Sequence, residues 1–151
     1  MKLLLLSDAN SVHTWKWVKS LISNDVNIKV FSLFKPNKDM HHLYKKNNVD
    51  VISPKINSKK FNLREPDLRK ISYLKNVTLL RRIIKDFSPN IVHAHYLSSY
   101  GLLGCLSGFK PLIISAWGSD VYYFPKISFS VRILNVQPFL SQNAEAASHF
   151  A

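Results

Sequence analysis

The sequence contains little cysteine, little glycine and no long apolar run. Its single cysteine, Cys105, excludes an internal disulfide. We expect this residue to be a small buried side chain, because it lies in the apolar stretch 102–106. No segment approaches the roughly 18 uninterrupted apolar residues that a membrane span needs. The apolar start, residues 3–6, ends at Ser7 and is too short for the core of a signal peptide. We therefore expect a buried first strand and a cytoplasmic protein.

The four glycines do not form a dinucleotide- or phosphate-binding motif. The Gly-x-Gly-x-x-Gly fingerprint places glycines in the turn after the first strand, where the backbone approaches a pyrophosphate. That turn, residues 8–11, contains no glycine here. The Gly-x4-Gly-Lys-Ser/Thr loop and the Gly-x-Ser-x-Gly nucleophile elbow are also missing. Gly101 and Gly104 are instead expected to allow close packing of a helix on the sheet.

Positive charge outweighs negative charge, with 21 Lys and Arg against 9 Asp and Glu and a formal net charge of +12. Residues 1–86 carry almost all of this surplus. A one-sided positive field favours anionic partners such as a phospholipid surface, a diphosphate-linked lipid or nucleic acid, although a merely solvated basic face is the alternative. No nucleic-acid-binding motif is present, and most aromatic residues fall at core spacing. We therefore expect no nucleic-acid partner.

Short apolar runs alternate with stretches of helical periodicity. The runs predict strands at 2–7, 28–34, 49–53, 91–95, 111–116 and 137–141. Apolar residues at three- and four-residue steps, or small residues, predict helices at 12–23, 68–87 and 96–107. Residues 35–48 are expected to be a polar, basic loop and residues 55–67 a connector. The alternation predicts one α/β domain with a doubly wound, mainly parallel Rossmann-like sheet and helices on both faces. Residues 3–6 and 91–95 are expected to be adjacent central strands.

In such sheets ligands bind outside the carboxyl ends of the strands. This rule selects the loops 8–13, 93–99 and 117–123. His93 and His95 are two residues apart on a predicted strand, so both side chains should point to the same face. No carboxylate or cysteine lies near them in sequence, and we expect no metal site. Lining of an active cleft and a structural role in the core both remain open for this pair.

Two segments resemble glycosyltransferase family 4. Residues 88–96, Ser-Pro-Asn-Ile-Val-His-Ala-His-Tyr, resemble that family's Pro-Asp-Ile-Val-His-Ala-His strand. Residues 115–120, Ser-Ala-Trp-Gly-Ser-Asp, resemble its Thr-x-His-Gly-x-Asp segment. The opening strand and loop, with His13 at the start of a helix, are similar to the family's acceptor-side loop. The resemblance runs through nearly the whole chain, with Trp117 at a position where much of the family has histidine.

The resemblance implies the N-terminal, acceptor-side domain of a GT-B enzyme built from two facing Rossmann-like domains. Transfer in such enzymes retains the configuration at the sugar carbon and requires no metal. The nucleotide-sugar donor binds a C-terminal domain through a paired-glutamate motif that residues 1–151 do not contain. We therefore expect no cofactor in this chain and no turnover by the chain alone. The expected partners are a sugar or lipid-linked sugar acceptor, a separate donor-binding domain or subunit, and an anionic membrane at its inner face.

The resemblance and the carboxyl-end rule together give a set of candidate acceptor-binding residues, with no catalytic residue assigned. They are Asp8, Asn10, Ser11, His13, His93, His95, Tyr96, Trp117, Gly118, Ser119 and Asp120. The expected function is the acceptor half of a glycosyltransferase in polysaccharide or glycolipid biosynthesis. The alternative is a non-catalytic Rossmann-like module that docks on a membrane or on a partner protein.

Overall fold

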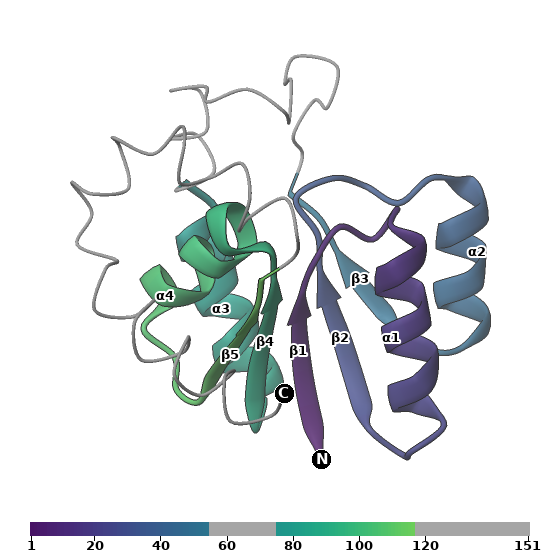
Figure 1. The fold of residues 1–151 in the computed structure, drawn as a ribbon, viewed down its shortest axis with the longest axis horizontal. Helices are drawn as coiled ribbons and strands as arrows, with labels where there is room; N and C mark the ends of the chain where they lie inside the picture. The colour runs from purple at the N-terminus through teal and green to yellow at the C-terminus, as the bar shows by residue number, and fades with distance from the viewer. Residues whose placement is uncertain (55–74, 117–151) are drawn as a thin grey trace. The chain divides into compact units, whose positions relative to one another are not determined.

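The computed structural model describes residues 1–54 and 75–116, and a five-stranded parallel sheet forms the centre of this part of the chain (Figure 1). The strands are β1 (Lys2–Leu6), β2 (Asn27–Phe31), β3 (Asp50–Ile52), β4 (Ile91–His95) and β5 (Leu112–Ser115). Their order across the sheet is β3-β2-β1-β4-β5, with every neighbouring pair parallel. The predicted adjacency of β1 and β4 is therefore confirmed. The strand predicted at 137–141 and the connector at 55–67 lie outside the described residues.

Helices cover both faces of the sheet, which confirms the doubly wound prediction (Figure 1). On one face lie α1 (Val12–Ile22) and α2 (Lys38–Lys46). On the other lie α3 (Val77–Phe87), the π-helical segment η3 (Tyr96–Gly101) and α4 (Leu102–Ser107). Right-handed crossovers produce this division, because the chain moves from β1 toward β3 and then from β4 toward β5 in the opposite direction. No helix in residues 1–54 and 75–116 is long and apolar enough to cross a membrane.

Two hydrophobic layers result from the alternation of side chains along the strands. The layer under α1 and α2 contains Leu3, Leu5, Ala9, Val18, Ile28, Val30, Tyr44 and Val49. The layer under the other helices contains Leu4, Leu6, Phe31, Leu33, Leu80, Ile83, Val92, Ala94, Tyr100 and Leu103. The unbroken leucine run of β1 therefore contributes to both layers, as expected of a strand that is buried on both faces.

The segment 35–48 was predicted as a loop, and this prediction is wrong because α2 occupies most of it. Asn37 caps the helix, its side-chain oxygen accepting a hydrogen bond from the amide of Met40 at 2.8 Å. Met40 and Tyr44, four residues apart, face the sheet, and Tyr44 is buried. The helix thus buries one narrow apolar stripe while its many Lys and His side chains remain in solvent.

The strand β2 ends at Phe31, three residues before the predicted end, although the apolar run continues. The amide of Ser32 still donates to the carbonyl of Ile52 in β3 at 3.0 Å, and side chains make further hydrogen bonds there. The Ser32 hydroxyl accepts a hydrogen bond from the amide of Ala9 at 3.1 Å and donates one to the carbonyl of Phe34 at 2.7 Å. The amide of Leu33 donates to the Tyr100 hydroxyl at 3.2 Å. The run therefore stays buried after the chain has left the sheet.

Two further boundaries concern the helices on the second face. The helix predicted over 68–87 begins at Val77, and residues 68–74 lie outside the described part of the chain. On α4, Gly104 packs against β5 as predicted, since a β-carbon at Gly104 would lie 2.9 Å from the Leu112 side chain. Cys105 is exposed, which corrects the expected burial. The helix packs through Leu103 and Gly104, so the next side chain turns toward solvent.

Candidate functional site

The order of the strands reverses between β1 and β4, which is where open parallel sheets bind their ligands. The chain leaves β1 toward β2 and leaves β4 toward β5, so the two following loops diverge. Ser7 directly follows β1, and His95 is the last residue of β4. These two side chains therefore meet at the carboxyl edge of the sheet, at the position that the topology favours for a site.

His93 and His95 lie together on the α1 side of the sheet, as the two-residue spacing predicted. Their ring centroids are 4.9 Å apart at an interplanar angle of 82°, and the residues are 5% and 1% exposed. Burial lowers the pKa of His93, and burial together with the neighbouring His93 lowers the pKa of His95 to about 4. Both imidazoles are therefore neutral at neutral pH, when each ring carries one donor and one acceptor nitrogen.

Hydroxyl groups hold the two imidazoles in place. The Ser7 hydroxyl lies 3.0 Å from Nδ1 of His95 and 2.7 Å from the hydroxyl of Thr14 on α1. Nε2 of His93 lies 2.8 Å from the hydroxyl of Ser115 at the end of β5. These bonds join β1, α1, β4 and β5 at a single edge. The candidate residues named from the sequence did not include Ser7, Thr14 or Ser115.

Trp17 on α1 contacts both imidazoles and was also missed. Its ring lies edge-to-face against His93 and His95, with centroid separations of 5.2 and 5.6 Å, and the residue is 41% exposed. One signal was present in the sequence. Trp17 falls outside the apolar stripe of α1 and lies three residues after Thr14, which places both on a second face of the helix. That second face is the one directed at β4.

The first loop uses its polar side chains largely for its own structure. The half-buried Asp8 accepts a hydrogen bond from the amide of Asn10 at 2.9 Å. The Asn10 side chain donates to the carbonyl of Lys35 at 3.0 Å and accepts from the amide of Asn37 at 2.8 Å. Asn10 therefore ties the loop after β1 to the segment that leads into α2, and both loops lie at the carboxyl edge.

Three further candidates follow the strands β1 and β4 at the same edge: Ser11, His13 and Tyr96. Ser11 is the N-cap residue of α1 but makes no capping hydrogen bond with its side chain, and His13 is exposed in the first helical turn. Tyr96 has a left-handed backbone, with φ of 67°, and packs against the core layer on the face opposite His95. Four candidates lie outside the described residues: Trp117, Gly118, Ser119 and Asp120.

No three His, Cys, Asp or Glu side chains in residues 1–54 and 75–116 gather closely enough to hold a metal ion. The neighbours of His93 and His95 described above are hydroxyls and an indole ring, which are poor ligands for zinc.

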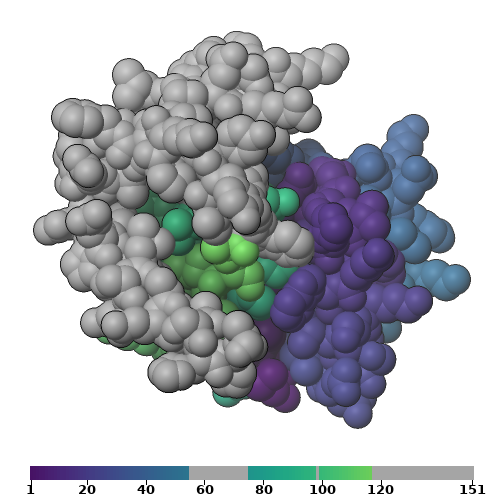
Figure 2. Space-filling view, in the orientation of Figure 1, coloured from purple at the N-terminus to yellow at the C-terminus, as the bar shows by residue number. Residues whose placement is uncertain are grey.

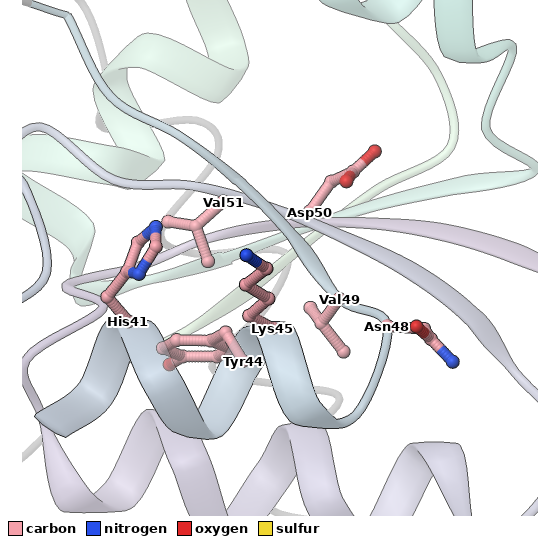
Figure 3. Close-up of a pocket in the computed structure, with 7 residues that line it drawn as sticks. All are labelled: His41, Tyr44, Lys45, Asn48, Val49, Asp50 and Val51. Carbon is pink, nitrogen blue, oxygen red and sulfur yellow. The ribbon is translucent and has the colours of Figure 1, made fainter.

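A separate hollow of about 420 Å³ lies between α2 and β3, at the far edge of the sheet (Figure 3). In Figure 3 the side chains of His41 and Lys45 rise from α2 toward Asp50 and Val51. This hollow shares no residue with the candidate acceptor-binding set. It is open to solvent and lined mainly by polar groups, and the histidine pair on β4 does not line it.

Comparison with known proteins identifies the family. Residues 2–145 match the family described as Glycosyl transferase 4-like. The chain belongs to this family. No curated protein matches the chain.

Solved structures with a similar fold include two of a deacetylase in the biosynthesis pathway of teicoplanin, one as a complex with bog and one with teicoplanin. The first has a TM-score of 0.56 and 12% identity, covering 78% of this chain and 66% of that chain. The second has a TM-score of 0.54 and 12% identity, with 81% and 72% coverage. This glycosyl transferase 4-like chain thus spans just under two thirds of the first structure's length. At such identity the likeness concerns the fold alone.

Proposed function

We propose that residues 1–151 form the acceptor-binding half of a nucleotide-sugar-dependent glycosyltransferase that acts with retention at the sugar carbon. The acceptor is a sugar or lipid-linked sugar used in polysaccharide or glycolipid assembly. A second domain or subunit, outside these residues, holds the donor, and transfer takes place in the cleft between the two. The proposal requires no metal and no cofactor on these residues.

The observation that carries this proposal is the pair His93 and His95 at the strand-order reversal of a glycosyl transferase 4-like chain. An acceptor sugar offers hydroxyl groups, each of which both donates and accepts hydrogen bonds. The buried, neutral imidazole of His93 holds the partly exposed hydroxyl of Ser115 in place, and a hydroxyl can both donate and accept a hydrogen bond. Positioning of this kind is a large part of what a transferase contributes to rate, because it removes the entropic cost of bringing two reactants together.

The acceptor role is tested by NMR titration of the ¹⁵N-labelled chain with uncharged methyl glycosides. We expect millimolar binding, with the signals of His93, His95 and Ser115 among those that move. The variant His93→Ala should weaken this binding, and the exposed His42→Ala on α2 should not. Glycoside binding that is equally strong in both variants would overturn the assignment of the site.

The donor role is tested by calorimetric titration of the same chain with UDP-glucose and GDP-mannose. We expect no binding in the micromolar range and no transfer to a glycoside by the chain alone. Micromolar affinity would overturn the claim that the donor is held elsewhere. A neighbouring reading frame that encodes a Glu-x7-Glu domain would supply the candidate partner, and transfer should then require both polypeptides.

A second candidate function is docking on an anionic membrane, which the basic surface of α2 favours. Five basic or titratable side chains of α2 are exposed: Lys38, His41, His42, Lys45 and Lys46. Asp39 is the single acidic residue of that helix. Near an anionic surface each Lys contributes on the order of 1 kcal/mol. A transferase that extends lipid-linked sugars works at such a surface, so docking and transfer are compatible.

Co-sedimentation with vesicles of neutral and of anionic phospholipid, at low and high salt, tests this docking. We expect binding to anionic vesicles that weakens steeply as salt screens the charges. Replacing Lys38, Lys45 and Lys46 with Gln should abolish it. The matched control replaces three exposed cations before and along α3, namely Lys75, Arg82 and Lys85, and should retain most of the binding. Equal binding to neutral vesicles would contradict an electrostatic mechanism.

A further inference from the structure

The side chain of Asn10 bonds the backbone of a segment that is distant in the sequence. Its Nδ2 donates to the carbonyl of Lys35 at 3.0 Å, and its Oδ1 accepts from the amide of Asn37 at 2.8 Å. A residue of a parallel strand bonds its neighbouring strand in the same way, at a carbonyl and an amide two residues apart. The carboxamide therefore imitates the pairing of β1 with β2 beyond Leu6 and Phe31, where the two strands end.

The bond to Asn37 completes the start of α2. Asn37 is the N-cap residue of this helix, and its side chain accepts the amide of Met40 at 2.8 Å. In a capping box the third helical residue also bonds the amide of the N-cap residue, through a Glu or Gln side chain. Met40 holds that position and has no side-chain oxygen. Asn10 supplies the missing acceptor from the loop after β1.

A second set of bonds joins the same loop to α2 from its buried side. The hydroxyl of Tyr44 donates to the carbonyl of Ala9 at 3.2 Å, and the amide of Ala9 donates to the buried hydroxyl of Ser32 at 3.1 Å. The loop is thus bonded to the beginning and to a later turn of one helix. In Figure 1 both α1 and α2 begin at the end of the sheet to which the strand arrows point, and Figure 2 shows the purple atoms of α1 beside the blue atoms of α2.

We propose that Asn10 is a positioning residue at the carboxyl edge, which holds the loop 8–11 and the start of α2 together as one unit for acceptor binding. The inference rests on the proposed function and differs from the direct acceptor contact that the sequence predicted for Asn10. Both donors of its carboxamide are in use, toward Lys35 and, at 3.4 Å, toward Asp8. One of its two acceptor positions is in use toward the amide of Asn37. Asn10 therefore acts through its neighbours.

The loop that Asn10 holds leads directly into α1. Ser11 is the N-cap residue of that helix and His13 lies in its first turn, and both are candidate acceptor-binding residues. Holding such side chains in one arrangement before the acceptor arrives lowers the entropic cost of binding. Loss of the Asn10 carboxamide should thus weaken binding without removing a group that touches the acceptor.

NMR relaxation of the ¹⁵N-labelled full chain tests the unit without a ligand. We expect order parameters of about 0.85, typical of rigid backbone, for the amides of residues 9–11 and of Asn37. Asn10→Ala should lower them toward about 0.6 in both segments. The matched control is Asn47→Ala, because the Asn47 carboxamide donates to the carbonyl of Leu43 at the other end of α2. The control should leave the order of both segments unchanged.

A second substitution separates coupling from local support. The side chain of Asn37 bonds the amide of Met40 in its own helix, so Asn37→Ala weakens the start of α2 and leaves every bond of the loop after β1 chemically intact. The order of residues 9–11 should nevertheless fall, because the amide of Asn37 then moves away from Asn10. In the Asn10→Ala background, Asn37→Ala should have no further effect on those residues. Support of the loop by Asn10 alone would not produce this dependence.

Affinity for uncharged methyl glycosides connects the unit to function. Asn10→Ala should raise the dissociation constant about threefold to tenfold, because the acceptor must then order the loop. Asn47→Ala should change it less than about twofold, as expected of a remote substitution. Circular dichroism checks that each variant is folded. If Asn10→Ala is not, Asn37→Ala weakens the same unit and should weaken binding in the same direction.

Three results would contradict the inference in distinguishable ways. Unchanged order of residues 9–11 in both Asn10→Ala and Asn37→Ala would overturn the coupled unit. Reduced order with unchanged glycoside affinity would show that these bonds serve the fold alone, and the proposed function would stand. Failure of every glycoside to bind the unaltered chain would overturn the proposed function and the acceptor role of Asn10 with it, although reduced order in the variants would still confirm the coupled unit.

Discussion

The two faces of β4 show how one strand serves both the core and the site. Toward α3 and α4 the strand presents Val92 and Ala94, both fully buried in an apolar layer. Toward α1 it presents His93 and His95, which are almost as buried but bonded to hydroxyls. Burial alone therefore does not distinguish core from site. The chemical nature of the buried neighbours does, because polar groups in the interior are retained only where each finds a partner.

The largest loss of stability is expected for a substitution in the apolar layer that Val92 and Ala94 join. Leu103 of α4 is 1% exposed within that layer. Leu103→Ala should lower the free energy of unfolding by about 2–5 kcal/mol, because it removes buried carbon and leaves a cavity. Leu106 of the same helix is 39% exposed, and Leu106→Ala should cost less than about 0.5 kcal/mol. Urea denaturation measures both values. Similar losses in the two variants would contradict the orientation of α4.

A smaller loss is expected on the polar face. Ser7→Ala removes the hydroxyl that bonds both Thr14 and His95 inside the protein. Each buried partner loses one hydrogen bond, so the free energy of unfolding should fall by about 1–3 kcal/mol. Ser23→Ala is the control, because that hydroxyl donates to the carbonyl of Ser20 in an exposed position at the end of α1. A cost for Ser7→Ala no larger than that of the control would show that the network contributes nothing to stability.

The two faces should also differ in their response to acid. Folding lowers the pKa of His95 from 6.5 to about 4 and lowers that of His93 in the same direction. At a pH between about 4 and 6.5, His95 is protonated in the unfolded chain but neutral in the folded chain. Stability from this source is complete above pH 6.5 and is lost as the pH falls toward 4. Urea denaturation at several pH values should show this slope. The slope should be reduced in His95→Gln and retained in His41→Gln, whose side chain is exposed on α2.

The smallest effect is expected at the outer edge of the sheet, where polar groups meet solvent. Lys29 and Asp50 form an ion pair at 3.2 Å between β2 and β3, with side chains 23% and 74% exposed. Asp50→Asn should lower the free energy of unfolding by less than about 1 kcal/mol, and by less still at high salt. If Asp50→Asn lowers the free energy of unfolding as much as Ser7→Ala does, burial would not determine how much a polar contact contributes to stability.

Sequence periodicity predicted the sheet because each strand repeats a simple pattern. The leucine run of β1 and the alternation in β4 require burial on both faces, which places both strands at the centre. The helix α2 was missed because its composition is mostly basic and polar. Its cap at Asn37 and the stripe through Met40 and Tyr44 were nevertheless visible in the sequence. A basic and polar composition is typical of a loop, but the cap and the spacing of apolar residues determine whether a helix forms.

The site was predictable only in part. The two-residue spacing was sufficient to bring His93 and His95 to one face. Trp17 reaches them because α1 crosses the sheet at a particular place, and that placement depends on packing against β2 rather than on any local pattern. Ser115 depends in the same way on the register between β4 and β5. Residues that converge through tertiary packing leave a weaker trace in one sequence than residues on a single strand.

Three backbone amides at the carboxyl edge donate to side chains of segments that are distant in the sequence. Ala9 donates to Ser32, Leu33 to Tyr100, and Asn37 to Asn10. In hydrogen–deuterium exchange, such amides exchange when a loop or a side chain moves. The amides between central strands exchange only after a larger part of the protein opens. The exchange rates of these three amides should therefore report local opening of the carboxyl edge, separately from global unfolding. A ligand that settles against that edge would slow these three amides first.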